Sequence, residues 1–202
     1  MVDFANLDLG YDQCRDIYTI IKNDGDSLLS DLKVTYDGLC KHWIGTDATN
    51  HINHMVDVFE GIDTFVAEVG TDMAFAADKI VEVQQVRRSN GSQGKVGESL
   101  QRVERRGAPD KIDDTVEYNC VPEASNDLRM LINVCEAFDQ YVNKIKSSST
   151  ELLQNWRSGN QRDKVQANIN KFEEDSVEFK KVLTETRTAL ETAIANISSI
   201  MD

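Results

Sequence analysis

The feature that most constrains the fold is a tryptophan–glycine break that occurs twice, each time inside a long amphipathic pattern. The chain has 202 residues and two tryptophans. The first break is Trp43-Ile44-Gly45, and the second is Trp156-Arg157-Ser158-Gly159. On both sides of each break, apolar residues recur at steps of three and four, which places them on one face of an α-helix. Glycine leaves the helical conformation at the least steric cost, so each break is predicted to be the turn of a helical hairpin.

The periodic stretches predict an all-α protein with four long helices. The first three helices are expected over residues 8–42, 47–88 and 123–155, and the fourth begins after Asn160. Both prolines lie outside these stretches, as expected for helices, because an interior proline costs about 3 kcal/mol. The expected organisation is a first hairpin at residues 1–88, a linker at 89–122 and a second hairpin at 123–202.

The two predicted hairpins are related by an internal repeat. Trp43 and Trp156 are separated by 113 residues, and the same offset aligns apolar residues on both sides of the turn. The aligned pairs are Ile21 with Val134, Leu28 with Tyr141, Leu32 with Ile145, Leu39 with Leu152, Ile52 with Val165, Val56 with Ile169, Phe59 with Phe172, Val66 with Phe179, and Val69 with Val182. One register that fits both sides of a rare turn indicates a duplicated unit.

A single hairpin is too thin to bury its apolar face, so the two hairpins are expected to pack together as an antiparallel four-helix bundle, a fused pseudo-dimer. The linker is long enough to join hairpins that run in opposite directions. A monomer is favoured, and exchange of hairpins between two chains is the alternative. The residues predicted to pack one hairpin on the other are Leu28, Leu32, Phe59, Tyr141, Ile145 and Phe172.

Charge is distributed unevenly along the chain. The net charge is −13, which argues against sequence-independent nucleic-acid binding. Residues 87–111 carry seven basic and three acidic side chains, a local charge of +4. This segment is either a solvated linker or one that folds onto the acidic bundle or a partner. A short helix around Val96, Leu100 and Val103 is also predicted.

The first break resembles the signature of the WxG (ESAT-like) family of type VII secretion substrates. Trp43 and Gly45 supply the signature, and Ala48 follows three residues after the glycine. The second break, with Trp156 and Gly159, is one residue longer. Members of that family are single helical hairpins that pair into antiparallel dimers. The resemblance implies a non-enzymatic secretion substrate, or a chaperone for a larger toxin. It also implies a type VII secretion ATPase, a WxG-family partner or the toxin as protein partners. The implied location is the bacterial cytoplasm before export and a secreted or extracellular one after it.

Other interpretations remain open at this level. Each tryptophan either anchors the core beside its turn or presents its indole for recognition. The whole chain is alternatively an unrelated cytoplasmic helical-bundle adaptor or scaffold. No phosphate loop, nucleophile elbow or zinc-protease element is present, so no enzyme activity, cofactor or metal is expected. The longest apolar runs are four or five residues, so no membrane span is expected. His51 and His54 could share a metal with Asp47 and Asp57, but two polar helix residues are the expected interpretation. Cys14 and Cys40 are expected to be small buried apolar residues.

Overall fold

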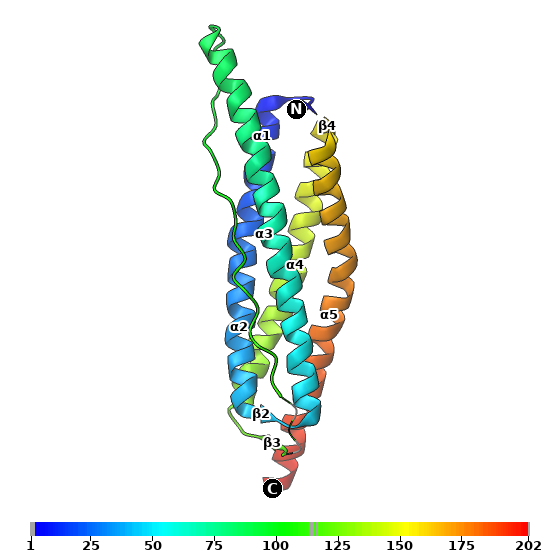
Figure 1. Cartoon of the computed structure of the whole chain (residues 1–202). Coiled ribbons are helices and arrows are strands. Elements are labelled where there is room, and N and C mark those ends of the chain that lie inside the picture. Colours follow the sequence, from blue (N-terminus) through cyan, green and yellow to red (C-terminus); the bar gives the residue numbers. More distant parts are fainter. Residues whose placement is uncertain (1–2, 114, 116, 202) are drawn as a thin grey trace. The chain divides into compact units, whose positions relative to one another are not determined.

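The computed structural model describes residues 3–113, 115 and 117–201, and the fold is an all-α four-helix bundle (Figure 1). The first helix is continuous through α1 (Leu7–Thr19), the π-helical segment η1 (Ile20–Asp24) and α2 (Gly25–His42). The others are α3 (Thr46–Ser89), α4 (Ala124–Asn155) and α5 (Asn160–Met201). Each predicted helix is confirmed to within a few residues. None of the helices within the described ranges is long and apolar enough to cross a membrane.

The chain forms two compact units, and segments of all four helices contribute to each. The first unit contains Met1–Asp26, Thr64–Arg105 and Tyr141–Glu174, and the second contains Ser27–Asp63, Arg106–Gln140 and Asp175–Asp202. The turn at Trp156 belongs to the first unit and the turn at Trp43 to the second. Each turn therefore lies among helix segments of the other hairpin, as expected for antiparallel hairpins.

The first helix passes through a π-helical segment, Ile20–Asp24, directly before Gly25. A π turn is wider than an α turn and is usually confined to a single bulge in a helix. Immediately after it, a Cβ atom on Gly25 would lie 2.6 Å from a methyl carbon of Val66 and 3.0 Å from the hydroxyl oxygen of Tyr141. Glycine is therefore required here by a close approach between helices, and the helix is maintained on both sides.

The residues predicted to pack one hairpin on the other all lie in the core. Leu28, Leu32, Phe59, Tyr141, Ile145 and Phe172 are buried. In the first unit, Phe65 of α3 stacks on Phe172 of α5 with ring centroids 3.8 Å apart. Tyr141 of α4 meets the edge of that stack, 6.0 Å from Phe172. This aromatic cluster joins the first hairpin to the second.

Burial follows the predicted repeat. The aligned pairs from Ile21 with Val134 to Phe59 with Phe172 are buried on both sides. Farther along the fourth helix, Phe179 and Val182 are only half-buried, whereas their partners Val66 and Val69 are buried. The two hairpins therefore use the same core positions near their turns and diverge towards the end of the second helix of each.

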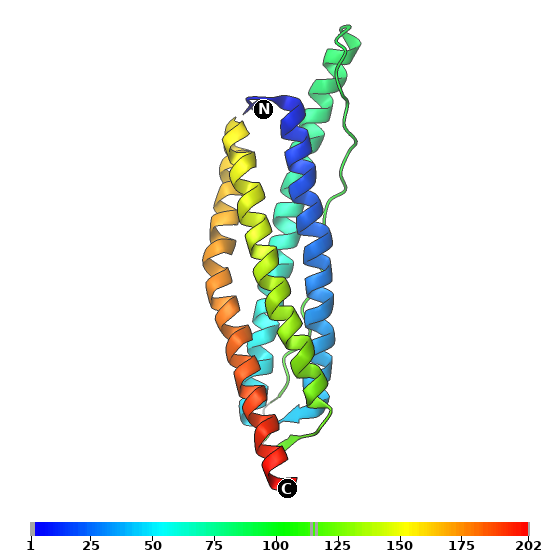
Figure 2. The same cartoon turned by 180° about the vertical axis from the view of Figure 1, so that it is seen from behind.

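Two-stranded pairings close both turns. In the first unit, β1 (Asp3–Phe4) pairs antiparallel with β4 (Trp156–Ser158). In the second unit, β2 (Trp43–Ile44) pairs antiparallel with β3 (Asn119–Cys120). Seen from behind, the short arrows of β2 and β3 lie side by side at their turn (Figure 2). The segment that precedes each hairpin thus covers the turn of the other.

The segment after α3, residues 92–113, is extended and is here named the strap (green trace in Figure 1). The short helix predicted around Val96, Leu100 and Val103 is wrong. The strap backbone makes hydrogen bonds to side chains of the first hairpin. Because these side chains satisfy its backbone, the extended form needs no helical hydrogen bonds.

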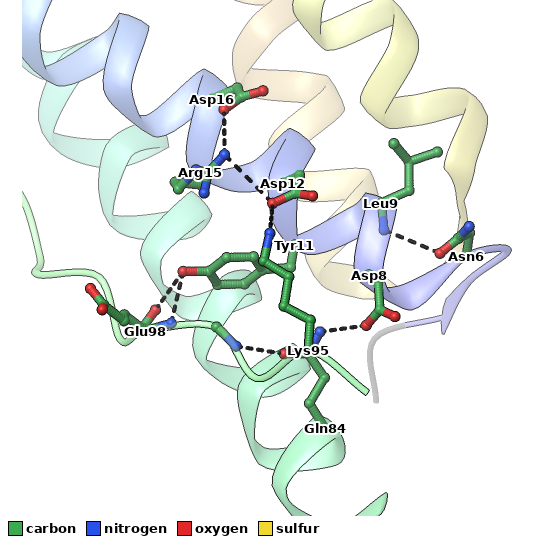
Figure 3. A network of polar contacts seen from close by, with 11 residues as sticks. Asn6, Asp8, Leu9, Tyr11, Asp12, Arg15, Asp16, Gln84, Lys95 and Glu98 are labelled. Atoms are coloured by element: carbon green, nitrogen blue, oxygen red, sulfur yellow. Dashed lines mark hydrogen bonds and ion pairs between the residues drawn. The ribbon is translucent and has the colours of Figure 1, made fainter. Parts of the chain in front are cut away.

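In the first unit, the strap is held by α1 and α3 (Figure 3). The Tyr11 hydroxyl donates to the Glu98 carbonyl at 3.0 Å and accepts from the Glu98 N–H at 2.8 Å. Gln84 accepts from the Gly97 N–H at 3.0 Å. Lys95 forms an ion pair with Asp12 at 2.8 Å.

In the second unit, the strap lies on α2 and α3. Asp63 is fully buried, and its two carboxylate oxygens accept from the backbone N–H groups of Arg106 and Gly107 at 2.9 and 3.0 Å. The Asn53 amide accepts from the Ile112 N–H at 2.8 Å and donates to the Ile112 carbonyl at 3.0 Å. Of the two alternatives for the basic segment, folding onto the bundle is therefore confirmed.

Candidate functional site

The two tryptophan turns share a backbone geometry that only glycine adopts readily. Gly45 has a φ of +135° and Gly159 a φ of +126°. A side chain at either position would be strained, because L-residues rarely occupy this region. The positive φ therefore explains why glycine occupies both predicted turn positions, even though the second turn is one residue longer.

The Trp156 turn is built around a fully buried indole. Phe4 of β1 stacks on Trp156 with ring centroids 5.0 Å apart. The Asn155 carbonyl accepts from the Ala5 N–H at 2.8 Å. The Asn155 side chain accepts from the Asn6 N–H at 2.9 Å and donates to the Asn6 carbonyl at 3.0 Å. These bonds fix the leading segment of the chain against the second turn.

The Trp43 turn has the same plan with different side chains. The His42 carbonyl accepts from the Val121 N–H at 3.0 Å. The His42 ring nitrogen Nδ1 lies 2.7 Å from a carboxylate oxygen of Asp127, which is buried. The Trp43 indole is buried and stacks on His51 with centroids 5.8 Å apart. The segment before α4 therefore covers the first turn as the segment before α1 covers the second.

Sequence reasoning missed these two covering segments. Phe4 and Cys120 lie in dipeptides too short to show a period, and they pair with the turns across more than 70 residues of chain. They are also separated by 116 residues, whereas the repeat has an offset of 113. The one available signal was Phe4, an aromatic residue outside any helical pattern.

The position of the indoles bears on the two interpretations of the tryptophans. Trp156 is fully buried and Trp43 is 3% exposed. The Trp156 ring nitrogen Nε1 is buried without a hydrogen-bond partner among the described residues. Burial favours the core-anchor interpretation, because neither indole is presented on the surface. A role for Trp43, Gly45, Trp156 and Gly159 in recognition stays a prediction.

The histidine pair on α3 takes part in the turn. His51 packs on Trp43, and no group of three metal-ligating side chains gathers within the described ranges. Burial lowers the pKa of His51 below its ordinary value of 6.5, and the nearby charge of His54 lowers it further. Its neutral form is therefore the one that fits against the indole.

We expect this histidine to make stability depend on pH. Below pH 6.5 the unfolded chain takes up a proton at His51 that the folded protein binds less readily. Its stabilising contribution is therefore complete above pH 6.5 and is lost as the pH falls through the lower pKa of the folded state. Melting temperatures of wild type and His51→Gln, measured across this range, should converge as the pH falls. A difference that stays constant with pH would contradict the expectation.

The cysteines lack the environment of reactive thiols. Burial raises the pKa of Cys14 to about 12, and burial also raises the pKa of Cys40, Cys120 and Cys135. The thiolate is the nucleophilic form, so these shifts disfavour reactivity. Cys14 is buried as predicted, whereas Cys40 is half-buried.

Two of the cavities formed by described residues lie between α4 and α5 of the second hairpin. One, of about 170 Å³, is in the second unit and is lined in part by Cys135, Asp139 and Arg187. The other, of about 400 Å³, is in the first unit and is lined in part by Ser149 and Gln166. Comparisons of the chain with protein-family models, with curated proteins and with solved structures found no match.

Proposed function

We propose that this chain is a non-enzymatic binding protein of the WxG (ESAT-like) kind. It acts through helical protein–protein contacts, either as a type VII secretion substrate or as a chaperone that escorts a larger toxin. Its partners are a type VII secretion ATPase, a WxG-family protein or the toxin itself. It resides in the bacterial cytoplasm before any export.

The reciprocal closure of the two turns is the observation that carries this proposal. Phe4 packs on Trp156, and Cys120 pairs with Trp43, so each half covers the turn of the other. Reciprocal contacts of this type are the property of a symmetric dimer interface, in which the same patch is used twice. On this proposal, the pairing that WxG proteins achieve between two chains lies within one chain. This supports a fused pseudo-dimer that remains a monomer.

The decisive experiment follows export in a bacterium with a type VII system. The chain is expressed in the parent strain and in a strain that lacks the membrane ATPase of that system. A substrate is expected in the culture medium of the parent strain only. A chaperone is expected to stay inside the cell, bound to a protein whose export requires both the chaperone and the ATPase. Light scattering of the purified protein is expected to give the 22.7 kDa of one chain.

A different result would favour the cytoplasmic adaptor. If neither the chain nor any bound protein depends on the ATPase for export, the secretion proposal is wrong. A mass of two chains that persists on dilution would instead replace the pseudo-dimer with exchange of hairpins. The two readouts are independent, so failure of one leaves the other interpretable.

A further inference from the structure

The second hairpin carries an open groove at the same place where the first hairpin is covered by the strap. The groove lies between α4 and α5 in the first unit and contains the cavity of about 400 Å³. Its lining includes Lys146, Ser149, Leu153, Arg162, Gln166 and Ile169. The repeat offset of 113 residues relates these positions to Lys33, Tyr36, Cys40, Thr49, Asn53 and Val56 of the first hairpin.

In the first hairpin, two of the equivalent positions, Tyr36 and Asn53, bind extended backbone. Asn53 holds both the N–H and the carbonyl of Ile112, a paired contact that a side-chain amide makes as a strand would. The Tyr36 hydroxyl donates to the carbonyl of Asp110 at 2.5 Å. Gln166 stands in the place of Asn53 and carries the same amide group, whose oxygen accepts from Arg162 at 2.8 Å. Ser149 stands in the place of Tyr36, and its smaller side chain leaves room between the helices.

The two grooves differ in charge at two equivalent pairs of positions. In the first, Lys111 of the strap forms an ion pair with Asp57 at 2.6 Å. The second groove has Asn170 in place of Asp57, and Arg162 in place of Thr49. Relative to the first groove, a negative charge is thus removed and a positive one added, whereas Glu173 of the second groove matches Glu60 of the first. An acidic segment is therefore more favoured in the second groove than in the first.

Arg162 is held ready at the groove wall by the turn. Its Nε donates to the Trp156 carbonyl at 2.6 Å, and one terminal nitrogen donates to Gln166 at 2.8 Å. That nitrogen also lies 3.4 Å from a carboxylate oxygen of the exposed Asp163, and the other donates to the Leu153 carbonyl at 3.5 Å. A partner's carboxylate would therefore compete with a solvated ion pair. The Arg162 side chain is only 22% exposed. A guanidinium fixed in this way loses little conformational freedom when it meets a carboxylate.

We propose that the groove between α4 and α5 binds an extended, acidic peptide segment of a partner protein, in the manner in which the first hairpin binds the strap. The proposal rests on the proposed function in one respect, that the occupant belongs to a protein partner. A binding measurement with defined peptides tests the groove separately from the secretion function, because it needs neither export nor a secretion ATPase.

The test uses the full-length protein labelled with ¹⁵N and two synthetic peptides. Both span residues 104–118, the end of the strap and the five residues after it, and one carries the change Lys111→Glu. The Lys111→Glu peptide is expected to bind about three- to fivefold more tightly than the native peptide, as for a solvated ion pair. Its amide shifts should map to residues 146–173. Gln166→Ala should weaken the binding of both peptides by a similar factor.

A matched pair of variants tests the charge argument. Asn170→Asp gives the open groove the carboxylate of the first hairpin and should reverse the preference, so that the native peptide binds more tightly. Asp57→Asn makes the opposite change in the occupied groove and should leave both affinities as in wild type.

The absence of a saturable shift with millimolar peptide would overturn the proposal. Shifts that map to residues 46–63 would also overturn it, because the peptide would then be displacing the strap. So would a doubled mass by light scattering that Gln166→Ala abolishes, because a second copy would then be the occupant.

Discussion

Replacing Trp156 with alanine is expected to lower the free energy of unfolding by about 3 to 5 kcal/mol, the range for truncation of a large buried aromatic residue. The indole is among the largest fully buried side chains, and Phe4 stacks on it. Its removal would leave a cavity at the point where the leading segment closes the turn. Urea denaturation followed by circular dichroism measures the change.

The matched controls separate packing from hydrogen bonding. Trp156→Phe keeps an aromatic ring against Phe4 and loses no indole hydrogen bond within the described residues, so a smaller loss is expected. Val177 on the same hairpin is 72% exposed, and Val177→Ala should change stability by less than about 0.5 kcal/mol. If Trp156→Ala denatures at the wild-type midpoint, the indole is not a core anchor.

Replacing Asp63 with alanine is expected to release the strap. The buried carboxylate accepts two backbone N–H groups, from Arg106 and Gly107. Hydrogen bonds to a charged group contribute about 1.5 to 3 kcal/mol each, so the loss of both should reach about 3 to 6 kcal/mol. After detachment, these N–H groups can bind water, so the change is local. Limited trypsin digestion should cut the variant rapidly at Arg105 and Arg106, and the wild type slowly.

Asp57→Asn is the control for this experiment. It removes the ion pair with Lys111, in which both side chains are about half exposed. A solvated pair of this kind contributes about 0 to 1 kcal/mol, so the strap should stay bound. Equal digestion of the Asp57 and Asp63 variants would show that the strap is held by its charge and not by the buried carboxylate. Such a result would also weaken the comparison between the two grooves.

The strap and the two covering segments change how the turns are to be understood. Each turn is covered, so that its buried indole and its glycine pack against a segment from the other half of the chain. Any partner that recognises the tryptophan element in the folded protein contacts the exposed residues around the turn, not the indole itself. In the second turn these include Arg157 and Ser158, which are both exposed.

Local periodicity determined the helices, the two turns and the repeat. A helix requires only that apolar residues recur every three or four positions, and Leu28, Phe59, Tyr141 and Phe172 do so within their own stretches. The turn positions of Gly45 and Gly159 could likewise be predicted, because the need for an unusual φ is a property of the turn itself. These features depend on neighbours in sequence, so the sequence by itself was enough.

Tertiary structure alone decided what the irregular segments do. Val96, Leu100 and Val103 have the spacing of a helix, yet this stretch is extended because Tyr11, Gln84 and Thr71 satisfy its backbone from other parts of the chain. The same holds for Phe4 and Cys120, whose partners are turns far away in sequence. Such contacts depend on which helix faces which, and no local pattern encodes that. The open groove on the second hairpin is likewise a tertiary feature, because the strap covers the equivalent positions on the first hairpin.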